Sequence, residues 1–232
     1  MKIALINPNS TAAMTEKAAQ AARHYAAADT EIRASNPTNS PPSIEGHYDE
    51  VMAMPGLLSE MKAAREWGAQ GYVIACFDDP GLGACREVVE GPVVGMCEAA
   101  MHFASIVGTS FSVVTTLPRS VPIVEELAHR YGKTAICKKV RAADIPVLDL
   151  EEDAAVAEQK ISEEIARAIV EDRCEAIILG CAGMTDLTEK LSQKHGVPVI
   201  DGVVCAVKLC EGLVSAGIQT CKVGGYAWPR EK

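Results

Sequence analysis

Three kinds of segment are missing from this chain of 232 residues. Its 22 lysines and arginines are scattered and its net charge is -9, so we expect no surface for nucleic acid or an anionic membrane. No apolar run reaches the roughly 18 residues of a membrane-spanning helix. The N-terminus enters a strand-like segment without the apolar stretch of a secretory signal. We therefore expect a cytoplasmic protein that acts on a small molecule.

The chain also lacks a Cys-x-x-Cys pair, although it contains nine cysteines. The odd count and the missing signal argue against a disulfide framework, and no spacing fits a structural zinc site. We therefore expect no metal. Most of the cysteines are expected to be small buried side chains, namely Cys97, Cys137, Cys174, Cys205, Cys210 and Cys221.

What the chain does contain is an alternation of short apolar strands and helical patterns. An apolar content of 48% is enough for a full core. The pattern predicts helices over residues 12–27, 81–90, 120–131 and 152–172, and from 203 onward; it predicts strands near residues 2–6, 31–34, 72–76, 93–95, 111–116, 135–140, 176–180 and 198–200. Such alternation predicts an α/β fold of mostly parallel sheets flanked by helices.

The alternation occurs twice along the chain. A shift of 105 residues places Cys76 on Cys181, and a shift of 106 places Pro92 on Pro198. At the start of the chain, a shift of 110 places residues 3–6 on 113–116. We infer an internal duplication with two units of about 100 residues each. Each unit would have a sheet of about four strands and one cysteine at the same structural position.

Cys76 and Cys181 both follow an apolar strand and precede a turn. Ligands of parallel sheets bind at the carboxyl ends of the strands. Asn7, Asn9, Thr115 and Thr116 also stand at strand ends, so two facing units would enclose one cleft that holds all of these side chains. Asn9 could instead cap the first helix.

Two thiols on opposite faces of a carbon acid suit racemisation, because one removes the proton and the other returns it. We expect the helix starts that follow Cys76 and Cys181 to lower the pKa of the thiols. Their backbone amides would hold an enolate oxygen. Carboxylates such as Asp78 and Asp79 beside Cys76 would oppose thiolate formation, so the residue pattern favours helix-start carboxylates without a chemical role.

Residues 36–48 form a segment rich in proline, asparagine and serine. It is too irregular for a helix or strand and long for a connection. Such a segment is typical of a functional lid.

These features resemble the aspartate/glutamate racemase superfamily, and more closely its hydantoin racemase branch, which also includes allantoin racemases. The matching motifs are residues 6–11, 43–46, 75–82, 92–100, 179–184 and 201–203. The resemblance implies two pseudo-symmetric α/β lobes with the active site between them, residues 1–97 with 205–232 and residues 98–204. It also implies a homo-oligomer and chemistry without a cofactor.

By the same resemblance, Cys76 and Cys181 are the catalytic acid/base pair. The implied substrate-binding residues are Asn9, Phe77, Asp78, Thr115, Thr116, Ala182 and Gly183. Amino-acid racemases of the superfamily usually carry polar residues after their cysteines. Phe77 and Ala182 stand there in this chain, which fits a neutral ring better than a zwitterion.

The sequence therefore favours racemisation of 5-substituted hydantoins, with allantoin among the candidate substrates. Three other enzymes stay open: an amino-acid racemase of the aspartate/glutamate type, a maleate-type isomerase with a cysteine nucleophile, and a malonate-type decarboxylase. A decarboxylase needs only one protonating cysteine, so the pair counts against it. A small-molecule sensor without turnover is the alternative outside enzymes.

Overall fold

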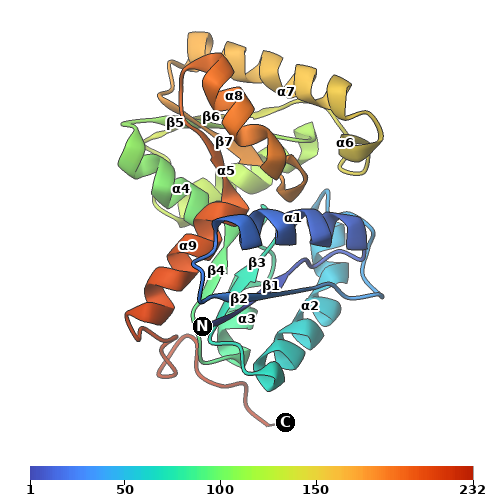
Figure 1. The fold of residues 1–232 in the computed structure, drawn as a ribbon, viewed down its shortest axis with the longest axis vertical. Coiled ribbons are helices and arrows are strands. Elements are labelled where there is room, and N and C mark those ends of the chain that lie inside the picture. Colours follow the sequence, from blue (N-terminus) through green and yellow to red (C-terminus); the bar gives the residue numbers. More distant parts are fainter. Residues whose placement is uncertain (232) are drawn as a thin grey trace.

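The computed structural model describes residues 1–231, which form two parallel sheets with helices on their faces (Figure 1). The first sheet has the order β2-β1-β3-β4, with β1 (Lys2–Ile6), β2 (Glu31–Ser35), β3 (Gly71–Ile74) and β4 (Val93–Gly95). The second has the order β6-β5-β7-β8, with β5 (Phe111–Thr115), β6 (Cys137–Ala142), β7 (Ala176–Gly180) and β8 (Val199–Asp201). The matching orders confirm the predicted α/β fold with two equivalent sheets.

Helices follow nearly every strand. The first half contains α1 (Ala12–Tyr25), α2 (His47–Trp67), α3 (Leu82–Val88) and α4 (Met96–Val107). The second half contains η1 (Pro118–Ser120), α5 (Val121–Arg130), α6 (Asp149–Glu152), α7 (Ala154–Arg167), η2 (Ala168–Asp172), η3 (Ala182–Leu187), α8 (Thr188–His195) and α9 (Gly202–Ser215). Within residues 1–231, no helix is long and apolar enough to cross a membrane.

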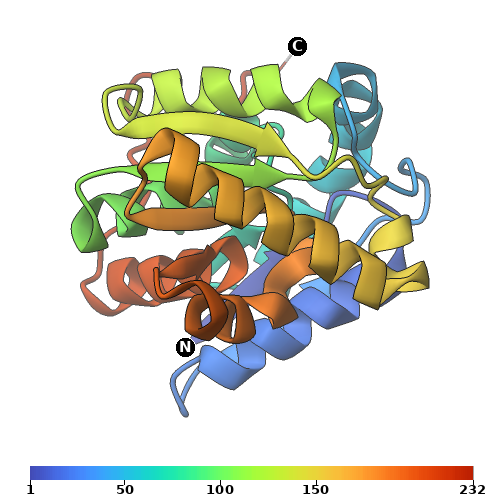
Figure 2. The same ribbon diagram turned by 90° about the horizontal axis from the view of Figure 1, so that it is seen from above.

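Alternate residues of each strand face different apolar clusters. On β1, Ala4 and Ile6 pack with α2 and α3 on the outer face of the first sheet. On the second sheet, α7 and α8 cover the outer face, and α7 crosses it in the view from above (Figure 2). The inner faces of both sheets share one core, in which Leu5 and Ile178 belong to the same cluster as residues of α4 and α9.

The last helix returns to the first sheet. The thiol of Cys210 lies 3.9 Å from the carbonyl of Tyr72 in β3. On the same helix, Glu211 accepts hydrogen bonds from the Ala27 amide at 2.8 Å and the Thr30 hydroxyl at 2.6 Å. These contacts join α9 to the first sheet, and the division into lobes, with residues 205–232 in the first, stays a prediction.

Several helix and strand ends differ from the prediction; the helix predicted over 81–90, for example, is α3 (Leu82–Val88), and the strand predicted over 72–76 is β3 (Gly71–Ile74). The first helix ends at Tyr25 because the next residue is extended, with ψ 153°. The strand predicted from residue 135 begins at Cys137, since a turn closed by hydrogen bonds to the Lys133 carbonyl precedes it. The helix predicted over 152–172 begins only at Ala154, because Glu152 ends the separate helix α6 and Asp153 caps α7, and it finishes as the π-helical turn η2.

Candidate active site

One small pocket contains both thiols. It lies where the central strands of both sheets end, so both halves of the chain contribute to it. Its walls are formed by Asn9, Met14, Ile44, Ala75, Cys76, Phe77, Asp78, Thr115, Thr116, Ser120, Val147, Gly180, Cys181 and Ala182. Its volume is about 30 Å³. That space is far below the roughly 300 Å³ at which ligand pockets begin, so the pocket is too small for a ligand as it stands, although both thiols remain partly exposed.

Matched turns follow the two cysteines. The amide of Asp79 donates to the Cys76 carbonyl at 3.1 Å, and the amide of Met184 donates to the Cys181 carbonyl at 3.2 Å. The Gly183 amide also donates to the Cys181 sulfur at 3.4 Å. The turn after Cys181 enters η3 at once, whereas α3 begins only at Leu82. The internal duplication therefore extends to the turns that hold the thiols.

Burial raises the pKa of both thiols. The pKa of Cys76 lies well above its ordinary value of 9.0, and that of Cys181 is raised to about 11. The charge of Asp78 raises both pKa values further, and the Gly183 amide lowers that of Cys181. The predicted lowering of the thiol pKa values is wrong, because loss of solvation outweighs the turn amides.

Asp78 is a buried carboxyl group in the wall of this pocket, with 8% of the residue exposed. Burial raises its pKa to about 7, and the charges of Glu50 and Asp79 add to the rise. Among residues 1–231, no lysine, arginine or histidine lines the pocket. A carboxylate ligand would therefore meet a carboxyl group and no basic side chain in the described pocket wall, although the charge of Lys17 reaches Cys181 and lowers its pKa.

Asn9 presents its amide nitrogen to the pocket. Its side-chain oxygen accepts hydrogen bonds from the Asn7 side chain at 2.8 Å and from the Thr11 amide at 2.9 Å. Its nitrogen has only the Met14 sulfur as a partner, at 3.7 Å. The side chain thus folds the turn before α1 without capping the helix, and it keeps a donor for a ligand. Asn7 does not line the pocket.

The other predicted contact residues divide into two groups. Phe77, Thr115, Thr116 and Ala182 all line the pocket, whereas their contact with a substrate stays a prediction. The Thr115 hydroxyl donates to the Gly180 carbonyl at 3.2 Å, which joins the ends of β5 and β7. Gly183 is not among the lining residues, and its amide serves the Cys181 sulfur instead.

The sequence did not indicate several apolar walls of the pocket. Ile44 belongs to the segment predicted as a lid, and Val147 belongs to the loop between β6 and α6. These loops meet through Glu45, whose carboxylate accepts a hydrogen bond from the Val147 amide at 3.0 Å. The irregular composition of residues 36–48 was the signal for Ile44. Val147 carried no comparable signal, because its loop has no motif.

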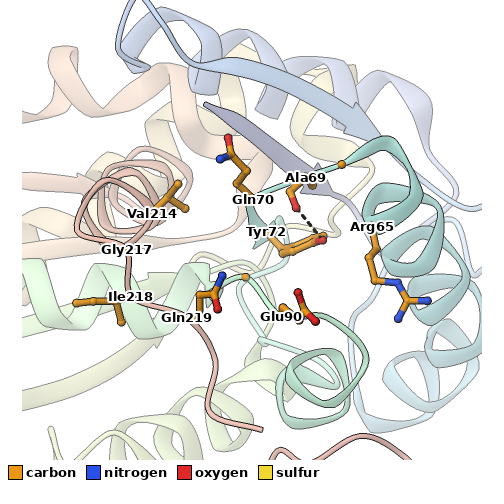
Figure 3. A pocket seen from close by; sticks show the side chains of 11 residues that line it. Arg65, Ala69, Gln70, Tyr72, Glu90, Val214, Gly217, Ile218 and Gln219 are labelled. Carbon is orange, nitrogen blue, oxygen red and sulfur yellow. Dashed lines mark hydrogen bonds between the residues drawn. The ribbon is translucent and has the colours of Figure 1, made fainter.

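A larger cavity of about 440 Å³ lies at the opposite ends of the first-sheet strands (Figure 3). Its walls include Arg65, Tyr72, Glu90 and Ile218, and the Tyr72 hydroxyl points to the Ala69 carbonyl at 3.1 Å (Figure 3). It contains no thiol. In the part of the chain that the structure describes, no group of three or more His, Cys, Asp or Glu side chains could hold a metal ion. The pocket with Cys76 and Cys181 is therefore the candidate active site.

Known proteins resemble this chain over its whole length. A hydantoin racemase of Rhizobium meliloti is 55% identical over 232 residues, which are 100% of this chain and 96% of the relative. A hydantoin racemase of Paenarthrobacter aurescens is 42% identical, with 100% and 99% covered. The solved structure of an allantoin racemase from Klebsiella pneumoniae matches with a TM-score of 0.98 and 49% identity, over 100% of this chain and 95% of that one. A family model described as Asp/Glu/Hydantoin racemase matches residues 3–210, and the chain therefore belongs to this family.

Proposed function

We propose that this protein racemises 5-substituted hydantoins at C5, with allantoin among the candidate substrates and Cys76 and Cys181 as the acid/base pair. The observation that carries the proposal is one small pocket that contains a thiol from each half of a duplicated fold. The names of the full-length relatives, hydantoin racemase and allantoin racemase, support the reaction and the substrate class.

In the proposed mechanism, one cysteine is a thiolate and the other a thiol when the substrate binds. The thiolate removes the C5 proton, and the electron pair of the C–H bond moves into an enolate at the neighbouring carbonyl. The opposite thiol then donates its proton to the other face of C5. The cysteines leave with exchanged protonation states, so the second enantiomer is processed in reverse.

The enolate oxygen needs hydrogen-bond donors, because its charge develops in a buried site. The Asn9 side-chain nitrogen is one donor, since the oxygen of that amide is already used within the turn. Backbone amides of the turn after Cys76 are further donors. We assign Thr116, Phe77 and Ala182 to contacts with the ring.

The absence of a cation from the pocket walls favours a neutral ring. An amino acid or maleate would bring carboxylates beside Asp78 without a basic partner, and a buried unpaired charge is strongly unfavourable. A hydantoin carries no charge, and its N–H groups can donate to the Asp78 carboxylate. These points disfavour an amino-acid racemase and a maleate-type isomerase.

The small volume of the pocket supports a lid. A volume of about 30 Å³ leaves no room for a hydantoin, so part of the wall must move before binding. We propose that residues 36–46, which contribute Ile44, move together with the loop around Val147. The lid segment predicted over residues 36–48 extends too far, because α2 already begins at His47.

We also propose a homo-oligomer in the cytoplasm. Exposed apolar side chains on the described surface support an assembly, among them Tyr48 and Val51 on α2 and Ile106 on α4, with exposed fractions of 72%, 69% and 81%. Light scattering coupled to gel filtration measures the number of subunits, and a monomeric species at micromolar concentration would contradict the assembly.

The reaction is tested with one enantiomer of a 5-alkyl hydantoin in D2O. Optical rotation reports inversion, and loss of the C5 proton signal in NMR reports deuteration. We expect the wild-type protein to do both, and Cys76→Ser and Cys181→Ser each to lose racemisation by several orders of magnitude. Cys221→Ser is the matched control, because this cysteine does not line the pocket and is exposed. The prediction that Cys221 is buried is therefore wrong.

Two outcomes would contradict the proposal. Racemisation that survives the loss of both thiols would exclude the cysteine mechanism. Tight binding of hydantoin by the wild-type protein, without deuteration of either enantiomer, would indicate the sensor and not the enzyme.

A further inference from the structure

Asp79 is the most enclosed carboxyl group near the candidate active site, with 2% of the residue exposed. It follows Cys76 by three residues but does not line the pocket. Its backbone adopts φ 44°, in the left-handed region that residues with a side chain rarely occupy. An unfavourable backbone conformation and a buried carboxyl group at one residue call for a structural reason.

The side chain of Asp79 provides that reason. One carboxylate oxygen accepts a hydrogen bond from the Cys97 amide at 3.1 Å, and the other accepts one from the Glu98 amide at 2.8 Å. Both amides belong to the first turn of α4, where helix donors lack partners and negative charge is favoured. The hydroxyl of Tyr131, just after α5, donates to the second oxygen at 2.7 Å.

The surroundings are shaped for this carboxylate. A side-chain carbon at Gly95 would overlap the carboxyl group of Asp79, so the glycine leaves it the necessary space. Of the hydrogen bonds found within residues 1–231, those of Asp79 are the only ones from a side chain of residues 77–81 to another element. This side chain is thus the polar attachment of the turn to the rest of the molecule.

The turn after Cys181 is attached differently. Asp186 of η3 forms an ion pair with Lys17 of α1 at 3.0 Å, but its side chain is 60% exposed. Exposed ion pairs contribute little to stability. The two halves of the site are therefore held unequally, by a buried carboxylate at Cys76 and by an exposed ion pair at Cys181.

We propose that Asp79 is a positioning residue for Cys76, and that its carboxylate fixes the Cys76 turn to α4 and Tyr131. The inference rests on the proposed function, in which Cys76 exchanges a proton with the substrate. Asp79 does not touch the substrate. It sets the place of the sulfur relative to C5, where an error of about 1 Å costs on the order of 100-fold in rate.

The test uses the full-length protein with Asp79→Asn and Tyr131→Phe. Asparagine places an amide group where the α4 amides need an acceptor, and phenylalanine removes a single hydrogen bond. Tyr72→Phe is the matched control, because the Tyr72 hydroxyl also donates one hydrogen bond but lies at the opposite end of the strands. We expect kcat to fall on the order of 100-fold in Asp79→Asn and 10-fold in Tyr131→Phe, with KM changed less than about threefold. Tyr72→Phe should retain its kcat.

Alkylation by iodoacetamide, followed by peptide mass spectrometry, reports the position of each thiol. A loosened turn should raise the alkylation rate of Cys76 at least several-fold in Asp79→Asn, while that of Cys181 stays unchanged. Cys210 of α9 is fully buried in the apolar core, so its alkylation reports global unfolding. Equal acceleration of Cys76, Cys181 and Cys210 would reduce Asp79 to a general stabilising residue and overturn the proposal.

The two proposals fail in distinguishable ways. A wild-type protein without racemase activity would contradict the proposed function, and the alkylation rates would still decide whether Asp79 holds the Cys76 turn. An active wild-type protein whose Asp79→Asn variant keeps its kcat and its Cys76 alkylation rate would overturn the positioning role alone.

Discussion

Glu45 and Val147 join two loops that are distant in the sequence. The Glu45 carboxylate accepts a hydrogen bond from the Val147 amide at 3.0 Å, and the neighbouring Ile44 and Val147 side chains both line the pocket. This hydrogen bond therefore ties the segment after β2 to the loop after β6, over the thiols.

Removal of this tie should open the pocket. We expect Glu45→Ala to raise KM about three- to tenfold, because closure over the substrate loses a hydrogen bond worth about 1 kcal/mol. Glu45→Gln is the matched control, since glutamine keeps an oxygen acceptor and both variants lose the charge. Steady-state kinetics with a 5-alkyl hydantoin measure the effect. Equal KM values for the two variants would show that the hydrogen bond has no part in closure.

The raised pKa values of the thiols predict that activity increases with pH. The reaction needs one thiolate, and its population grows as the pH approaches about 11 for Cys181. Log kcat/KM should therefore rise between pH 7 and pH 10, after subtraction of the rate without enzyme. An activity maximum below pH 7 would contradict the pKa values derived from burial.

The charge of Asp78 should determine the pH range over which log kcat/KM rises. Above its own pKa of about 7 it is ionised, and its charge raises the pKa of both thiols. Asp78→Asn removes the charge, so the rising limb of log kcat/KM should move to lower pH even if KM increases. Asp201→Asn serves as the control, because Asp201 does not line the pocket. If the rising limb of log kcat/KM in Asp78→Asn stayed at the wild-type pH or moved to higher pH, this electrostatic role would be excluded.

Asp201 predicts a pH-dependent change in stability. Its buried carboxyl group has one oxygen without a hydrogen-bond partner in the described part of the chain, and burial raises its pKa from 3.8 to about 7. Between these values the folded state keeps a proton that the unfolded state releases, so the contribution of Asp201 to stability falls as pH rises from 4 to 7. Asp201→Asn removes this loss and keeps an oxygen for the start of α9.

Urea unfolding at pH 5 and pH 8 measures the difference. Relative to the wild-type protein, the free energy of unfolding of Asp201→Asn should improve by on the order of 2–4 kcal/mol between the two pH values. The same difference between variant and wild type at both pH values would show that Asp201 titrates normally.

Gly180 should not accept a side chain. An added carbon would lie 2.9 Å from the Thr115 side-chain carbon and 3.0 Å from the Thr115 backbone, between the ends of β5 and β7. We expect Gly180→Ala to lower the free energy of unfolding by about 1–3 kcal/mol and to reduce kcat, since both residues line the pocket.

Gly212→Ala is the matched control for that substitution. Gly212 lies inside α9 with open space around it, so alanine should raise the free energy of unfolding by up to about 1 kcal/mol. Thermal unfolding measures whether each variant is more or less stable than the wild-type protein. A stabilised Gly180→Ala would contradict the tight contact with Thr115.

The residues that the sequence did identify are those whose position follows from the strand pattern. Cys76, Thr115 and Cys181 stand at strand ends, and parallel sheets bring such ends together whatever the intervening loops do. Ile44 and Val147 line the same pocket from two loops. Hydrophobic periodicity in a sequence does not predict which loops lie in contact. The hydrogen bond between Tyr131 and Asp79 could not be predicted from the sequence either, because it joins residues far apart in the chain.

The direction of the thiol pKa shifts is a second property that the sequence alone did not predict. The turns after Cys76 and Cys181 were recognisable, and amides of both turns do stabilise the thiolates. The enclosure of the sulfur atoms depends on the side chains of both sheets packed together, and this burial decides the direction of the shift.

The single core between the two sheets limits how the pocket can open. Leu5 of β1 and Ile178 of β7 belong to one apolar cluster that continues through α4 and α9. Moving the sheets apart would expose this cluster to water, whereas loop movement leaves it intact. The two copies of the ancestral unit have thus become interdependent, and neither is expected to fold when it is expressed alone.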